Sequence, residues 1–445
     1  MCYLPGTVPE ICPLRAYRYT ATDELPDLIA PPYDVVGPEQ REALGERSLY
    51  NIVHLDLPQG DDDDKYARAA GLLQQWIDRG VLAQDEGPCF LSYAQTFAPP
   101  DGGAPITRRG FFALVKAEPY ASREILPHER TLSGPKVDRH KLFVATGAAL
   151  SPVFLLFEDP DGVARPAIEA SQELASFTTD DGIEHRLGRI NDPATLQRVT
   201  ESLQKQPLLI ADGHHCYETT VKYAAETEQA RIDEGVDPSP RGGHQYVLAF
   251  LAEGDDPGLV VYGTHRLVFG LKDFDRDAFR QRVEDSFSVT PFAGSDGELT
   301  AALAEHGADG QSVAARFPDG TTWLLRLRPE ALEREPLASE PAVLRETDVV
   351  VLHTALLEGV LGITREQQAS QAHLRYFKST EQALEAIGGG EGDVLFLMNG
   401  TPVKQVRDAC LAGEVMPQKS TFFFPKIPTG LAIHLLDPDD EIRPA

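Results

Sequence analysis

The sequence is short of cysteine, and its cysteines show no pairing pattern. The 445 residues include five cysteines, an odd number, and no two of them form a CxxC pair. This pattern argues against a disulfide framework and against a structural zinc site. It is typical of a protein kept in a reducing compartment, so we expect a cytoplasmic protein.

Positive charge and long apolar runs are also scarce. The chain has 41 Lys and Arg residues against 69 Asp and Glu residues, which gives a formal net charge of −28. Such a charge repels nucleic acid and anionic membrane, so neither is expected as a partner. No apolar run approaches the roughly 18–20 residues that cross a bilayer. The start of the chain has no basic region followed by an apolar segment, so a signal peptide is not expected.

Several familiar catalytic signatures are missing as well. The sequence contains no Walker A motif, no GxGxxG after a strand, no HExxH and no GxSxG elbow. No single motif therefore identifies the function, although a small-molecule anion could bind where basic residues cluster. The sequence gives no prediction of the oligomeric state.

Strand-like and helix-like segments are mixed along the whole chain, which predicts an α/β (α+β mixed) fold. Its length suggests two or three domains, and we expect a catalytic domain over residues 1–270 and a C-terminal α/β region over 271–445. Residues 89–97 and 108–118 predict a hairpin, and 151–159 and 207–212 predict buried strands. Residues 65–82 and 216–232 predict helices. The alternation in NIVHLDLP, residues 51–58, predicts a strand, in which His54 has a structural role.

The stretch LLIADGHHCYETT, residues 208–220, places polar groups where a strand becomes a helix. A helix N-terminus offers free N–H groups and a positive dipole end, which favour phosphate or carboxylate. Gly213 lets the backbone approach a ligand, and His214 and His215 suit phosphate binding, acid–base chemistry or metal binding. Asp212 could instead cap the helix. Cys216 could be a nucleophile, but we favour a small buried filler.

Residues 124–142 concentrate cations in an otherwise acidic chain. A turn at Gly134-Pro135 precedes a helix that we expect to point Val137, Leu142, Val144 and Ala145 inward. Lys136 and Arg139 near its first turn would suit a phosphorylated ligand, and Glu129 is a candidate base. The alternative is a solvated helix face whose cations pair with acids.

Two further segments carry candidate ligand groups. In APPYDVV, residues 30–36, two prolines fix the chain and present Tyr33 and Asp34 on a rigid turn, although the turn could be purely structural. In MPQKSTFFFPK, residues 416–426, Lys419 and Ser420 could contact phosphate or substrate, as could Thr421 and Lys426. The aromatic run there could equally be a core strand.

Taken in order, these motifs resemble those of a bacterial and archaeal family catalogued as domain-of-unknown-function ten-fifteen. The motifs are APPYDVV, NIVHLDLP, LPHERTLSGPKVDRHKL, SPVFLLFED, IADGHHCYETT, LLEGVLGI and MPQKSTFFFPKIPTGL. The Asp-Gly-His-His element is similar to that of the ParB/sulfiredoxin-like superfamily, which includes free serine kinases. The resemblance implies a ParB/sulfiredoxin-like nucleotide-binding core and a nucleotide-dependent phosphotransferase acting on serine or O-phosphoserine. The ten-fifteen family usually has arginine after the two histidines, where this chain has Cys216.

The resemblance and the residue chemistry together give a set of expected roles. The phosphates of ATP or ADP would be held by Asp212, Gly213, His214 and His215, with charge neutralised by Lys136 and Arg139. Mg²⁺ would be held by Asp212 or Asp138. The expected catalytic residues are Glu129 as base, His128 as second choice, and His215. The expected substrate contacts are Lys419, Ser420, Tyr33 and Asp34.

Two other functions stay open from the sequence. One is a regulatory protein that binds a nucleotide or an amino acid without catalysis, which Cys216 in place of arginine favours. The other is a metal-dependent hydrolase with His214, His215 and His128 as ligands.

Overall fold

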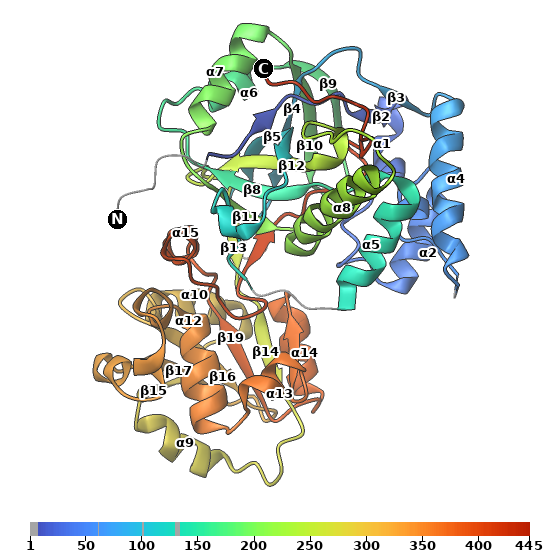
Figure 1. Cartoon of the computed structure of the whole chain (residues 1–445). Coiled ribbons are helices and arrows are strands. Elements are labelled where there is room, and N and C mark those ends of the chain that lie inside the picture. The colour runs from blue at the N-terminus through green and yellow to red at the C-terminus, as the bar shows by residue number, and fades with distance from the viewer. Residues whose placement is uncertain (1–7, 61, 100–101, 130–133) are drawn as a thin grey trace. The chain divides into compact units, whose positions relative to one another are not determined.

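The structure is a computed structural model that describes residues 8–60, 62–99, 102–129 and 134–445, and it forms two compact units (Figure 1). Unit 1 comprises the described residues of 1–127, 131–259 and 425–445, and unit 2 those of 128–130 and 260–424. The predicted domains 1–270 and 271–445 stay a prediction. The compact units divide the chain differently, because most of unit 2 is residues 260–424 and the last 21 residues, 425–445, belong to unit 1. Both units combine helices with sheets, which confirms the α/β class.

A large mixed sheet forms the centre of unit 1. Its hydrogen-bonded order is β6-β11-β8-β12-β5-β4-β10-β9, with β1 beside β5. Most neighbours are antiparallel, but β11 runs parallel to β6 and β12 runs parallel to β8. The strands are β1 Ile11–Cys12, β4 Phe90–Phe97, β5 Ile106–Lys116, β6 Ile125–Leu126, β8 Val153–Phe157, β9 Gln172–Thr178, β10 Glu184–Ile190, β11 Leu208–Asp212 and β12 Tyr246–Glu253.

The central strands carry apolar side chains on both faces, and both faces of the sheet are buried. Phe111 and Leu155 lie in a core cluster on one face. On the other face Phe112, Phe154 and Phe250 pack ring against ring. The hairpin predicted from residues 89–97 and 108–118 is confirmed as β4 and β5, and the predicted strands β8 and β11 are confirmed as well.

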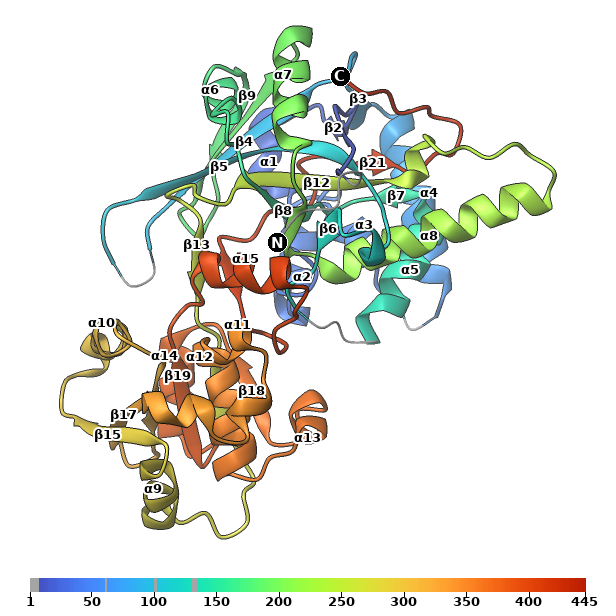
Figure 2. The same cartoon turned by 60° about the vertical axis from the view of Figure 1, so that its left-hand side comes forward.

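Helices pack around this sheet, and α4, α5 and α8 lie side by side (Figures 1 and 2). The helices of unit 1 are η1 Thr22–Glu24, α1 Leu25–Leu28, α2 Pro38–Arg47, α3 Val53–Asp56, α4 Asp64–Asp78, η2 Tyr120–Ser122, α5 Gly134–Thr146, α6 Ala164–Glu169, α7 Pro193–Leu203, α8 His214–Asp233 and η3 Gly243–Gln245. Two small ladders complete the unit: β2 Tyr17–Tyr19 with β3 Leu82–Gln84, and β7 Ala148–Ala149 with β21 His434–Leu435. The second ladder fixes the end of the chain in unit 1.

The strand predicted for residues 51–58 is wrong, because this segment contains the short helix α3. Asn51 is fully buried, and its side-chain oxygen accepts a hydrogen bond from Val53 N at 2.9 Å. Its amide nitrogen donates to Asp27 O and Ile29 O. An Asn that binds the backbone two residues ahead starts a turn and outweighs the alternation of the sequence. His54 Nε2 lies 3.2 Å from Gly45 O, which fits the structural role expected for it.

Helix α5 is confirmed, but its predicted inward face is partly wrong. The side chains of Val137 and Val144 are 61% and 57% exposed. The buried face instead carries Arg139, Leu142 and Phe143, which have the i, i+3, i+4 spacing of one helix side. The prediction left Arg139 out of the inward face, although the fold buries it beside the carboxylates of Asp56 and Asp138.

Unit 2 is built on a second sheet of order β15-β17-β16-β19-β14-β18, and β13 and β20 form a separate pair. The strands are β13 Val260–Tyr262, β14 His265–Val268, β15 Phe287–Phe292, β16 Ser312–Arg316, β17 Thr322–Leu327, β18 Leu374–Phe377, β19 Val394–Met398 and β20 Phe422–Phe424. The helices are α9 Arg276–Glu284, α10 Asp296–His306, η4 Pro329–Glu333, η5 Leu337–Ser339, α11 Ala342–Arg345, α12 Asp348–Val350, the π-helix η6 Val351–Val360, α13 Arg365–Ala369, α14 Thr380–Gly388 and α15 Val403–Ala412. Among the described residues, none of the helices combines the length and the apolar character that crossing a membrane requires.

Candidate functional site

The junction between β11 and α8 has the strand–turn–helix form that the sequence predicts. Strand β11 ends at Asp212, and Gly213 is the N-cap of α8 with φ 87° and ψ 28°. A Cβ on Gly213 would lie 3.3 Å from Val153 Cα, so both the left-handed conformation and the close strand favour glycine. Among the described residues, α8 has no side-chain cap, which rules out the N-cap role considered for Asp212.

Asp212 is tied to a lysine from the far end of the chain. Lys426 Nζ lies 2.5 Å from Asp212 Oδ2, and Gly213 N donates to Oδ1 at 3.0 Å. Burial opposes ionisation of the carboxyl, but the charges of Lys426 and His214 outweigh it and lower the pKa of Asp212. The junction therefore holds an ionised carboxylate and a lysine ammonium side by side at a helix N-terminus. His214 and His215 follow on the first turn, both half-buried.

A buried arginine fixes the segment that carries Lys426. Arg108 on β5 donates from Nη2 to Pro425 O at 2.5 Å, and Gln95 Nε2 donates to Lys426 O at 3.0 Å. The guanidinium also lies 4.9 Å from the Phe154 ring centroid. Burial lowers the pKa of Arg108 to about 10. Arg108 was not among the predicted site residues. The sequence signal that could have identified Arg108 is an arginine in an apolar strand, four residues before Phe112 and so on the same face.

Cys216 is a buried, neutral thiol on the first turn of α8. Burial raises its pKa to about 12, although the nearby charge of Arg139 acts in the opposite direction. A thiol in this state is not a nucleophile, which agrees with the filler interpretation. The four cysteines among the described residues are all buried free thiols.

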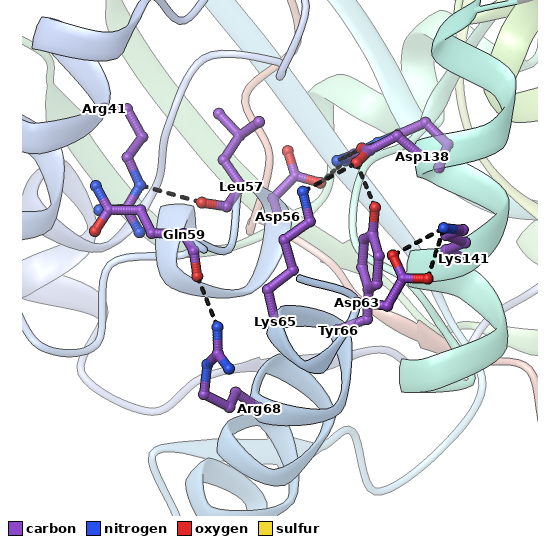
Figure 3. A network of polar contacts seen from close by, with 11 residues as sticks. Arg41, Asp56, Leu57, Gln59, Asp63, Lys65, Tyr66, Arg68, Asp138 and Lys141 are labelled. Carbon is purple, nitrogen blue, oxygen red and sulfur yellow. Dashed lines mark hydrogen bonds and ion pairs between the residues drawn. The ribbon is translucent and has the colours of Figure 1, made fainter. Parts of the chain in front are cut away.

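Arg139 is held by the carboxylates of Asp56 and Asp138, both of which are labelled in Figure 3. Its Nη1 lies 3.0 Å from Asp56 Oδ1, and its Nε and Nη2 lie 3.2 and 2.7 Å from Asp138 Oδ2. The guanidinium carbon stands 4.4 Å from the centroid of the Tyr33 ring. Burial works against the charge of Arg139, but Asp56 and Asp138 outweigh it and raise the pKa. The arginine expected to neutralise phosphate is therefore largely neutralised by its own neighbours.

The residues around Arg139, namely Asp56, Asp138 and Tyr33, have shifted pKa values too. Burial raises the pKa of Asp56, and the attraction of Arg139 only partly opposes it. For Asp138 burial is outweighed by hydrogen bonds from Tyr66 and Arg139, which lower the pKa. Burial raises the pKa of Tyr33 above its ordinary value, so its hydroxyl stays protonated. Asp56 is the member that the sequence had not suggested as a site residue.

Both predicted Mg²⁺ ligands, Asp212 and Asp138, are bound to a cation of the protein. One oxygen of Asp212 is taken by Lys426, and Asp138 accepts hydrogen bonds from Tyr66 and Arg139. Across the described residues, no group of three or more His, Cys, Asp or Glu side chains is arranged to hold a metal ion. Asp212 or Asp138 would have to share its oxygens with these partners to hold Mg²⁺, and that role stays a prediction.

The remaining predicted residues lie in unit 2 and form a second polar cluster. Glu129 accepts hydrogen bonds from Lys419 N at 3.2 Å and from Thr421 N at 2.9 Å. His128 Nε2 lies 2.7 Å from Thr421 Oγ1. Lys419 has a φ of 58°, the left-handed conformation, and its carbonyl accepts a hydrogen bond from the buried Arg266 at 2.9 Å. The Glu129 carboxylate therefore lies against the backbone of the MPQKST segment.

Ser420 is an unsuitable ligand for a substrate in this arrangement. It is 3% exposed, and its hydroxyl donates to Pro417 O at 2.5 Å. The predicted residues thus divide between the units. Unit 1 holds Tyr33, Asp34, Asp138, Arg139, Asp212, Gly213, His214 and His215, and unit 2 holds His128, Glu129, Lys419 and Ser420. Lys136 lies in helix α5, but its side chain is outside the described part of the chain.

Comparison with known proteins defines the family of the chain. Residues 11–350 match the family described as "Protein of unknown function (DUF1015)". The match spans most of the chain, so the protein belongs to that family, as the motifs predict. No curated protein matches the chain.

The chain is also similar, at low identity, to three solved structures. A conserved hypothetical protein from Pyrococcus furiosus is 15% identical, with a TM-score of 0.34 over 70% of this chain and 93% of that one. A free serine kinase in complex with AMP is 13% identical, with a TM-score of 0.37 over 72% and 91%. SbnI with C-terminal truncation from Staphylococcus aureus is 10% identical, with a TM-score of 0.37 over 74% and 90%. Likenesses this weak do not carry a functional argument.

Proposed function

We propose that this chain is a nucleotide-dependent phosphotransferase that moves a phosphoryl group between a nucleotide and free serine or O-phosphoserine. The observation that carries the proposal is the β11–α8 junction. There a left-handed glycine leads directly into a 20-residue helix whose first turn bears two histidines, with Lys426 alongside. The N-terminus of a helix and a nearby ammonium group both favour phosphate.

The roles of the junction residues follow from phosphoryl-transfer chemistry, which depends on positioning and charge neutralisation. In the proposal, backbone N–H groups of the first turn of α8 and the imidazoles of His214 and His215 hold the nucleotide phosphates. Lys426 supplies the charge that Arg139 cannot, since Arg139 is already paired with two carboxylates. Asp212 holds the Lys426 ammonium at the turn.

Glu129 remains our choice for the base that accepts the serine hydroxyl proton. Its carboxylate is fixed by the backbone of Lys419 and Thr421, so it cannot rotate freely. A fixed carboxylate suits a base whose direction matters. The side chain of Lys419 is proposed to bind the substrate carboxylate, and Tyr33 and Asp34 stay candidate contacts.

A second candidate function is a regulator that binds a nucleotide without turning it over. The observation in its favour is Cys216, a buried neutral thiol at the position where the family resemblance leads us to expect arginine. A thiol cannot form the paired hydrogen bonds that a guanidinium makes with phosphate.

The proposal is tested by ³¹P NMR of the full chain with Mg²⁺, O-phosphoserine and ADP, and then with serine and ATP. We expect conversion in one of the mixtures. Nucleotide binding without conversion in either would favour the regulator, and the absence of both would overturn the proposal.

His215→Ala links the activity to the junction. Loss of a residue that positions or protonates the transferred group lowers turnover by about 10²–10⁴-fold. The matched control is His140→Ala on α5, a histidine of the same unit that pairs with Glu226 outside the junction. We expect the control to keep its turnover. If His215→Ala unfolds, or if both variants lose activity equally, the junction is not the active site.

A further inference from the structure

Unit 1 contains a pocket that none of the proposed roles explains. It is a cavity of about 320 Å³ lined by Arg41, Leu57, Gln59, Lys65, Asp138 and Arg139, among others. Figure 3 labels three of the lining residues, Arg41, Gln59 and Lys65. Its volume lies at the lower end of the range for small-molecule sites, about 300–1,000 Å³, so a small metabolite would fill it.

The lining of this pocket is cationic in a chain with a net charge of −28. Three of its side chains are basic, Arg41, Lys65 and Arg139, and one is acidic, Asp138. Arg139 is neutralised by its carboxylate partners, and Lys65 Nζ lies 3.6 Å from Asp138 Oδ1. Because Asp138 also pairs with Arg139, at 2.7 Å, it compensates Lys65 only in part, so Arg41 and Lys65 are the lining cations whose charge needs explanation.

Arg41 has little of its hydrogen-bonding capacity satisfied by the protein. The structure gives it one hydrogen bond, from Nε to Leu57 O at 3.1 Å, and, within the part of the chain that is described, no ion pair. A guanidinium has five N–H donors arranged to bind an oxyanion in pairs. The side chain is partly buried at the pocket wall, where a charge without a partner is costly.

The start of helix α2 lies at the same pocket. Val36, Gly37 and Pro38 line it, and Gly37 is the N-cap of this 10-residue helix. Among the described residues, α2 has no side-chain cap. The positive end of its dipole therefore adds to the charge of Arg41 and Lys65. The cavity, the arginine without an ion pair and the helix end are separate features that all favour a negative ligand.

We propose that this pocket binds a small oxyanion, the phosphate or carboxylate group of a metabolite, through Arg41 and Lys65. Gln59 offers an amide donor at the same wall. The site does not depend on the proposed phosphotransferase activity, because none of these three residues belongs to the β11–α8 junction. Arg139 does link the two regions: it lines the pocket, and its charge acts on Cys216 in the first turn of α8.

The test is calorimetric titration of the full chain with inorganic phosphate and, separately, with acetate at low ionic strength. We expect saturable binding of at least one anion, and a tenfold or greater loss of affinity in Arg41→Gln. The matched control is Arg68→Gln, which removes the same charge from a neighbouring arginine. Arg68 donates to Gln59 O and pairs with Asp62, and it does not line the pocket. Its affinity should stay within twofold of wild type.

Further variants separate this site from the α8 junction and from misfolding. Binding should persist in His215→Ala and still depend on Arg41 there. If Arg41→Gln does not fold, Lys65→Gln replaces it, with Lys141→Gln as the control because Lys141 pairs with Asp63. Binding of phosphate alone identifies a phosphate ester as the ligand class, and binding of acetate alone a carboxylate. The proposal is overturned by no saturable binding of either anion, by equal losses in the matched variants, or by loss of all binding in His215→Ala.

Discussion

The buried pair of Arg139 and Asp56 gives the sharpest prediction for stability. The two side chains are 4% and 6% exposed, and Nη1 and Oδ1 are 3.0 Å apart. Arg139→Met keeps an apolar stem of similar length but leaves the Asp56 carboxylate buried without its cation. Breaking a buried pair from one side costs about 3–5 kcal/mol, because the remaining charge has lost its compensation. We expect a loss of that size in the free energy of unfolding of unit 1 at pH 7.

The loss should depend on pH, and its sign follows from Asp56. Burial already raises the pKa of Asp56 in the folded protein, so the folded state holds this proton more tightly than the unfolded chain does. Stability from this group is therefore present below the unfolded pKa of about 3.9 and falls as the pH rises through the folded pKa. Without Arg139 the folded pKa of Asp56 rises further. The gap between the variant and wild type should widen from about pH 4 to pH 7.

The assay is urea unfolding followed by tryptophan fluorescence. The chain has two tryptophans, Trp76 in unit 1 and Trp323 in unit 2. A Trp323→Phe background leaves Trp76, which is 1% exposed, as the reporter of unit 1. The matched control is Lys141→Met on the same helix, which breaks an exposed pair with Asp63 and should cost about 0–1 kcal/mol.

A double variant tests the cause of the loss. Asp56→Asn together with Arg139→Met removes both charges, so it should be more stable than the sum of the single losses predicts, by about 2 kcal/mol or more. The reasoning is refuted if Arg139→Met unfolds within about 1 kcal/mol of wild type. It is also refuted if the loss in unfolding free energy of the double variant equals the sum of the losses of the two single variants.

Two further variants address the proposed chemistry. Glu129→Gln should lower kcat by about 10²–10⁴-fold in the ³¹P assay while leaving the ADP affinity from calorimetry unchanged; weakened ADP binding would contradict the base role. Cys216 should resist alkylation, since a pKa of about 12 leaves roughly one thiol in ten thousand ionised at pH 8. Mass spectrometry of its peptide after iodoacetamide treatment, with and without urea, checks this, and labelling at equal rates in both conditions would show that the thiol is not protected.

Local sequence patterns predict much of the fold because many helices, strands and turns are determined by residues that are adjacent in the chain. The strand–glycine–helix order at Asp212 and Gly213 comes from an apolar run, a left-handed glycine and a long helical segment, all adjacent in the chain. Residues 51–58 show the limit of the same reasoning. There the alternation of side chains predicts a strand, but Asn51 forms hydrogen bonds that start a helix instead.

The partners of the polar residues could not be predicted in the same way. Arg139 was expected to neutralise a bound phosphate, but it pairs with Asp56, which lies 83 residues away in the sequence. Lys426 reaches Asp212 across 214 residues, and only because the last segment of the chain returns to unit 1. A charged side chain is buried only where the fold supplies hydrogen-bond acceptors or an opposite charge, and sequence spacing does not show which groups these are.

The family resemblance leads us to expect an arginine at the position of Cys216. The long-range ion pairs indicate which other cation could take its place. Arg139 already binds two carboxylates, and it would have to leave both to reach a phosphate. Lys426 pairs with Asp212, at the residue where the proposed phosphate-binding turn begins. A phosphate at that turn would lie beside the Lys426 ammonium, so Lys426 would not have to leave its place to contact it. We therefore favour Lys426, together with the N-terminus of α8, as the positive charge that replaces an arginine in the motif.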